Sequence, residues 1–203
     1  MAFSAPPRFA AWRHLDARDG FEVVFLELHD DGYRVEGHTA AVEDGEAWAV
    51  EYSIVLDRNW LTRHARVLGH SAGGRRETTL ETNGDGRWRV NGVAAPQLTG
   101  CLDVDLESSA FTNALPVHRL ALSVGQEADA PAAWVRAADL SVERLEQRYA
   151  REANEGDRQR YHYTSPAFEG LGPRVSGELF ETELVYDQAG LVIDYPGITV
   201  RAA

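Results

Sequence analysis

Residues 47–56 read AWAVEYSIVL and have the clearest structural pattern in the chain. Every second side chain in it is apolar or aromatic, from Trp48 through Tyr52 to Leu56, whereas the side chains between them are mixed in character. Successive side chains of a β-strand point to opposite faces, so this period of two predicts a strand with one buried face.

The same period of two recurs in both directions from this stretch. Turn signals such as Asn91-Gly92 and the run NGDG at residues 83–86 separate the alternating segments about every ten residues. We predict strands at residues 21–28, 33–42, 47–56, 60–68, 75–82, 87–90, 102–106, 118–123, 132–138, 141–150, 160–164, 179–186 and 191–195.

Residues 140–155 also permit a helix, because Val142, Leu145 and Tyr149 follow a helical spacing. In the alternative, Leu145, Gln147 and Tyr149 share one face of a strand. We favour the strand, because the neighbouring segments are all β.

The strand count predicts the architecture. Roughly 12 to 15 short strands in one domain must curl or close, since a flat sheet would leave long unpaired edges. We therefore predict an all-β, mainly antiparallel fold with a single highly curved sheet, a β-roll or half-barrel. We find no linker, so residues 1–203 are predicted to form one domain.

Composition excludes several classes of function. The net charge is −12, and all twenty basic residues are arginine, which argues against a general nucleic-acid binder. Without lysine the chain has neither a Schiff-base residue nor a P-loop. No apolar run approaches the ~18 residues of a membrane span, and residues 1–16 do not read as a signal peptide. We expect a cytoplasmic protein.

The metal and nucleophile signals are weak. The seven histidines are dispersed and lack metal-site spacing, so we expect neither a metal nor another cofactor. Cys101 is expected to be a buried small residue; as a nucleophile it would need a base such as His118.

Asp103 and Asp105 form the first candidate pair. Residues i and i+2 of a strand point the same way, so the two carboxylates share a face, and Arg119 on a returning strand could neutralise them. The pair fits either a polar binding or acid/base site, or a structural network of ion pairs.

Two further features allow two interpretations each. The segment 111–116 (FTNALP) contains Thr112, Asn113 and Pro116, and it either lines a site or fixes a corner of the chain. Residues 58–89 hold seven arginines against three acidic residues, a net charge of +4. They could bind an anionic ligand group, or form an ordinary solvated face.

Several motifs, in order along the chain, resemble those of the bacterial putative glycolipid-binding family, formerly a domain of unknown function. The main ones are GCLDVDL at 100–106, FTNALPVHRL at 111–120 and GLVIDYPG at 190–197. Trp88, Gly92 and the pair Gln147 and Tyr149 also agree. The resemblance implies a spiral β-roll, similar to half-barrel lipoprotein carriers that hold acyl chains on a curled sheet.

Three functional hypotheses follow. The first is a non-catalytic protein that binds a glycolipid or another amphipathic molecule on the concave face of the roll, in a cavity of at least ~300 Å³. The second is a hydrolase or isomerase of a carbohydrate or lipid, in which Asp103 forms the acid/base pair with Asp105 or Asp194. The third is an interaction module or homodimer that pairs through an exposed strand edge. The candidate ligand-binding residues are Asp103, Asp105, Thr112, Asn113, Arg119, Gln147, Tyr149, Asp194 and Tyr195.

Overall fold

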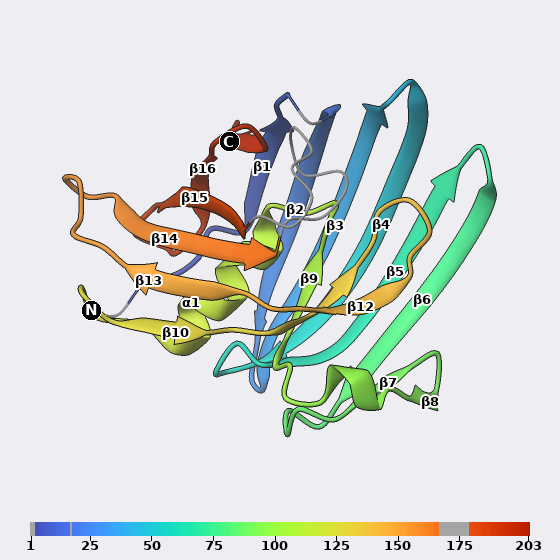
Figure 1. Ribbon diagram of the computed structural model, residues 1–203, viewed down its shortest axis with the longest axis horizontal. Coiled ribbons are helices and arrows are strands. Elements are labelled where there is room, and N and C mark those ends of the chain that lie inside the picture. The colour runs from blue at the N-terminus through green and yellow to red at the C-terminus, as the bar shows by residue number, and fades with distance from the viewer. Residues whose placement is uncertain (1–2, 17, 167–178) are drawn as a thin grey trace.

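The computed structural model describes residues 3–16, 18–166 and 179–203. Most of its strands belong to one large antiparallel sheet of 14 strands (Figure 1). In chain order these are β1 (Phe9–His14), β2 (Asp19–His29), β3 (Gly32–Glu43), β4 (Glu46–Asp57), β5 (Thr62–Ser71), β6 (Gly74–Thr82), β7 (Trp88–Val90), β8 (Val93–Ala94), β10 (Glu127–Asp129), β13 (Arg148–Arg151), β14 (Gln159–Pro166), β15 (Leu179–Tyr186), β16 (Val192–Tyr195) and β17 (Thr199–Arg201).

The large sheet curls but does not close. Its order begins at β10 and ends at β8, and β17 pairs with β1 to join the two ends of the chain. The predicted all-β fold with one large curved sheet is confirmed.

A second layer covers one face of the large sheet (Figure 1). It contains a three-stranded sheet of β9 (Asp103–Leu106), β11 (Ala132–Val135) and β12 (Val142–Leu145). The strands β9 and β11 run parallel, which the expectation of a single antiparallel sheet did not include. The short helices of this layer are η1 (Pro96–Leu98), η2 (Phe111–Asn113) and α1 (Ala114–Leu120).

The predicted strand at residues 118–123 is wrong, because residues 114–120 form α1. Pro116 lies in the first turn of this helix, where no amide hydrogen is needed. Four consecutive residues, Ala114–Val117, are buried, so the helix has no amphipathic pattern that the sequence could reveal. Residues 140–155 contain β12 and β13, which confirms β structure over a helix. The single strand predicted at 141–150 is wrong, because β12 and β13 belong to different sheets and Gln147 lies between them.

The core lies between the two layers. On β4, the five side chains predicted to face inward from Trp48 to Leu56 are all buried. Tyr52 needs room from the neighbouring strand, where a Cβ at Gly37 would lie 2.0 Å from its ring. Within the described ranges, no helix is long and apolar enough to cross a bilayer.

Candidate functional site

The first part of the predicted site is a buried ion pair. The strand β9 places Asp103 beneath α1, and Arg119 Nε donates to Asp103 Oδ1 at 3.0 Å. A second bond joins Arg119 Nη2 to Oδ2 at 2.5 Å. Burial raises the pKa of Asp103, and the hydrogen bonds and charge of Arg119 oppose that rise. The expected pairing is therefore present, although Arg119 comes from a helix.

Asp105 lies on the same side of β9 in a hydrogen-bonded cluster. Thr112 Oγ1 donates to Asp105 Oδ1 at 2.9 Å, and Gln147 Nε2 donates to Oδ2 at 2.6 Å. Gln147 Nε2 also donates to the Tyr163 hydroxyl at 3.1 Å. Burial is the main reason that the pKa of Asp105 rises to about 6, and the charge of Asp103 adds to it.

Asn113, Tyr149 and Tyr195 belong to a neighbouring aromatic cluster. The Tyr149 hydroxyl donates to Asn113 Oδ1 at 3.4 Å, and the Tyr195 and Tyr163 ring centroids are 6.2 Å apart. Asp194 precedes Tyr195 in β16 and so points to the opposite face of the strand. The structure thus brings eight of the nine predicted residues into one buried region.

The space among these residues is small. A void of about 40 Å³ lies beside Asp105, Asn113, Tyr163 and Tyr195. A buried water needs at least ~10–15 Å³, whereas pockets for ligands start near ~300 Å³. The void therefore fits water molecules and is too small for an acyl chain. His14 also borders it, and both of its buried ring nitrogens lack hydrogen-bond partners among the described residues.

Catalysis by Asp103 and Asp105 remains a prediction. Both carboxylates are occupied by the internal hydrogen bonds described above, and the adjoining void is too small for a sugar ring. An acid/base role would require this region to open.

Sequence reasoning missed Glu22, the most deeply buried carboxylate of the network. Tyr52 Oη donates to Glu22 Oε1 at 2.6 Å, Ser109 Oγ donates to the same oxygen, and Ala110 N donates to Oε2 at 2.7 Å. Burial is the main cause that raises the pKa of Glu22 to about 7. Glu22 thereby fixes the 109–110 segment of the second layer to the large sheet.

The alternation in β2 offers two candidate buried faces, and its large aromatic side chains favour the face opposite to Glu22. Phe21, Val23 and Phe25 suggest the buried face, but Phe21 and Phe25 are about half exposed, at 44% and 51%. Val24 and Leu26, which share the parity of Glu22, are buried instead. The burial of these two side chains places Glu22 inside the protein.

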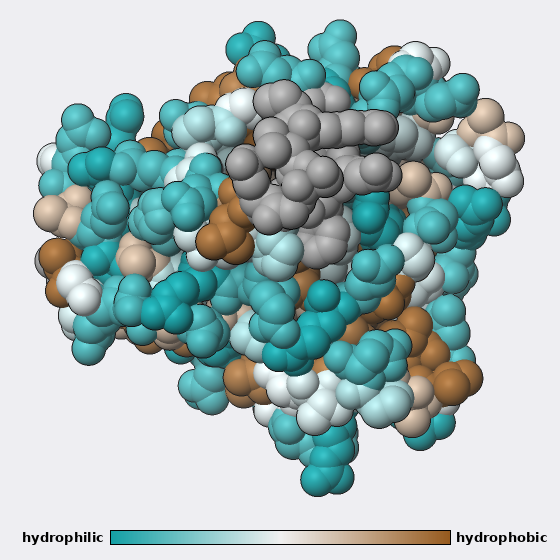
Figure 2. All heavy atoms as spheres, viewed as in Figure 1, coloured by the Kyte–Doolittle hydropathy of each residue, from teal (hydrophilic) through white to brown (hydrophobic). Residues whose placement is uncertain are grey.

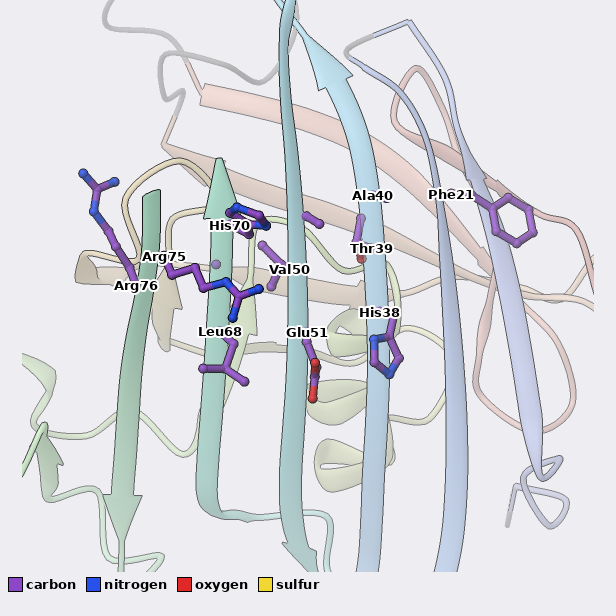
Figure 3. A pocket seen from close by; sticks show the side chains of 12 residues that line it. Phe21, His38, Thr39, Ala40, Val50, Glu51, Leu68, His70, Arg75 and Arg76 are labelled. Atoms are coloured by element: carbon purple, nitrogen blue, oxygen red, sulfur yellow. The ribbon is translucent and has the colours of Figure 1, made fainter. Parts of the chain in front are cut away.

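A hollow much larger than the void beside Asp105 lies on the other face of the large sheet, turned away from α1 (Figure 3). We call this the outer hollow. Its volume is about 610 Å³, and it extends over β2 to β6. One cross-strand row runs through it: Phe21 opposes Ala40, Ala40 opposes Ala49, Ala49 opposes His70, and His70 opposes Arg75.

Differences in side-chain size produce the outer hollow. Ala40 and Ala49 form a low floor, and larger side chains stand around it. Phe21 and Leu68 supply apolar walls, while the polar walls come from His38, Glu51, His70 and Arg75.

An exposed aromatic stripe continues from this hollow. Phe25 lies four residues after Phe21 on the same face of β2, and it opposes Phe9 of β1. All three rings are exposed, at 44% for Phe21, 51% for Phe25 and 55% for Phe9. By contrast, the surface on the side of β13 and β14 is mostly hydrophilic (Figure 2).

The weaker sequence candidates have structural explanations. Cys101 is buried, which raises the pKa of its thiol to about 11, and its Sγ lies 3.6 Å from Arg144. His118 stacks on Trp60 at a centroid distance of 3.6 Å, and its Nε2 is 2.9 Å from the Ala189 carbonyl oxygen. In the part of the chain that the structure describes, no group of His, Cys, Asp and Glu side chains could hold a metal ion.

Comparison with known proteins agrees with this fold. Residues 9–201 match the family described as putative glycolipid-binding. The chain belongs to this family.

Two solved structures resemble this putative glycolipid-binding family member. A DUF1089 family protein from Pseudomonas aeruginosa is 32% identical, with a TM-score of 0.72 over 89% of this chain and 91% of that chain. A beta-barrel-like protein of domain of unknown function DUF1849 from Brucella abortus is 13% identical, with a TM-score of 0.53 over 98% and 96% of the two chains. The second likeness shows the fold alone. The search of curated proteins gave no match.

Proposed function

We propose that this protein binds an amphipathic ligand of the glycolipid class, without catalysis, in the outer hollow. The observation that carries the proposal is the size and composition of this hollow. It offers about 610 Å³ with an apolar floor and polar walls, against about 40 Å³ among the buried residues of the second layer. Ligand sites combine apolar lining with a few polar groups in this way.

The two parts of an amphipathic ligand fit two parts of this surface. A sugar ring can lie on the floor of Ala40 and Ala49, within reach of the polar walls. An alkyl chain can follow the stripe of Phe21, Phe25 and Phe9, where it would cover apolar surface that is now exposed to water. The family description supports this ligand class.

The proposal is tested by titrating octyl β-D-glucopyranoside below its micelle concentration, with binding measured by calorimetry. Ala49→Trp fills the floor of the outer hollow and should weaken binding at least about tenfold, because the bulky ring occupies the ligand's space. Ala153→Trp, on an exposed loop elsewhere, is the matched control and should bind as the unmodified protein does.

Ligand contact at the nine residues predicted from the sequence stays a prediction. Such contact would require the void near Asp105 to widen far beyond about 40 Å³. Tyr149→Phe removes one buried hydroxyl and separates the two locations. Weaker binding in Tyr149→Phe with unchanged binding in Ala49→Trp would place the ligand inside the roll and would contradict the outer hollow.

A further inference from the structure

We propose that the head group of the ligand carries a negatively charged oxygen group, a carboxylate or a phosphate, and that Arg75 binds it together with His70. This inference rests on the proposed function, and it specifies the chemical class of the ligand at the same site.

The first argument is that Arg75 has an unused guanidinium. Its neighbours are occupied: Arg66 Nε donates to Glu77 Oε1 at 2.9 Å, and Arg76 Nη1 donates to the Ala138 carbonyl oxygen at 3.2 Å. Among the described residues, the Arg75 side chain makes neither a hydrogen bond nor an ion pair. Its planar set of donors is therefore free to bind a carboxylate or phosphate with two parallel hydrogen bonds.

The second argument is the direction of the side chain. Arg75 extends from β6 across β5 toward β4, over the hollow, whereas Arg76 points away from it (Figure 3). His70 opposes Arg75 directly across the two strands and projects from the same face. An anion at this end of the hollow would meet two nitrogen-bearing side chains.

The third argument is the local charge. The protein carries a net charge of −12, yet in the lining of the hollow the charge of Arg75 balances the carboxylate of Glu51, while the guanidinium of Arg76 points away. Glu51 lies in the cross-strand row next to that of His70 and Arg75. The charge of Glu51 acts on Arg66, because Glu77 is the main cause that raises the pKa of Arg66 and Glu51 adds to it. The Arg75 end of the hollow is thus the end that suits a negative charge.

The fourth argument is length. Four strand spacings separate Arg75 on β6 from Phe21 on β2, which corresponds to about 19 Å across the sheet. This distance accommodates an anionic group at Arg75, a ring on the floor of Ala40 and Ala49, and a chain that starts at Phe21. An acidic glycolipid carries these three groups in the same order.

The test compares two ligands that differ in one group. Octyl β-D-glucopyranosiduronic acid has the ring and chain of octyl β-D-glucopyranoside but a carboxylate in place of the hydroxymethyl group. We expect it to bind about tenfold more tightly in calorimetry at low salt, as a charge-assisted bidentate bond predicts. Arg75→Gln should bring the ratio of the two affinities close to one. Arg87→Gln removes the same charge from an exposed turn outside the hollow and should keep the ratio.

Each outcome separates this inference from the proposed function. Equal affinity for the two ligands in the unmodified protein would overturn the anionic head group and leave the proposed function standing. Binding of neither ligand would overturn the proposed function. Octyl phosphate and inorganic phosphate distinguish the source of the anion. Tighter binding of octyl phosphate than of inorganic phosphate supports the head group of a lipid as the source. Equal binding of the two overturns the assignment to a lipid head group.

Discussion

Glu22 shows how a single buried side chain can make stability depend on pH. Its pKa is about 7 in the folded protein against 4.5 as the ordinary value, so the folded state holds the proton more tightly than the unfolded state. The protonated side chain of Glu22 therefore stabilises the fold. This contribution is fully present below pH 4.5 and is lost as the pH rises through 7. Asp105, with a pKa of about 6, acts in the same direction. The pKa values of His14 and His118 are lowered to about 4, so these two side chains destabilise the fold only as the pH falls below 6.5.

Glu22 should therefore dominate the pH dependence above pH 6.5. We predict that the free energy of unfolding, measured by urea denaturation, falls by about 1 kcal/mol between pH 6.5 and pH 8.5. In Glu22→Gln this decrease should largely disappear, because the residue no longer ionises. Glu27→Gln, on the exposed face of the same strand, should keep the decrease. A steep decrease that persists in Glu22→Gln would show that another group causes it.

At the scale of the elements, the sequence predicts the strands well and the second layer poorly. The range 179–186 coincides with β15, and 47–56 lies within β4, because long half-buried strands show a clear period of two. The helix α1 lacked a pattern, because its residues are buried on several sides between two core clusters, with Leu115 in one and Val117 in the other. Arg119 was foreseen as a partner of the two carboxylates, and it pairs with Asp103. Thr112 and Gln147 were foreseen only as candidate ligand-binding residues, since the fold of the second layer determines that they meet Asp105.

The end of α1 contains a small strain that can be relieved. Ala121 caps the helix with φ 45° and ψ 44°, a left-handed conformation that costs a residue with a Cβ about 1 kcal/mol. We predict that Ala121→Gly raises the free energy of unfolding by about 0.5 kcal/mol, since glycine adopts this conformation freely but loses more entropy on folding. Ala153→Gly, at a position without a positive φ, should give no gain. Loss of stability in Ala121→Gly, measured by urea denaturation, would contradict this account of the cap.

At the scale of the whole molecule, the two faces of the large sheet have different roles. The inner face packs against β9, β11, β12 and α1, so its side chains are committed to the core. The residues that line the outer hollow all come from β2 to β6, and the outer face exposes both the aromatic stripe and Arg75. The concave face was the natural expectation from a curled sheet, and the filling of that face by the second layer moves the proposed ligand to the other side.

The ends of the large sheet bear on the hypothesis of a homodimer formed through a strand edge. The terminal strands β8 and β10 are two and three residues long, and Arg148 pairs with both Glu127 and Asp129 along β10. Short edges that carry charges offer few backbone groups to a partner. We therefore predict a monomer of 22.4 kDa whose mass in analytical ultracentrifugation does not change between micromolar and hundred-micromolar protein. If the mass instead doubles reversibly with concentration, Phe25→Ser identifies the contact: a dimer that persists in this variant forms through an edge, and one that dissociates forms through the aromatic stripe.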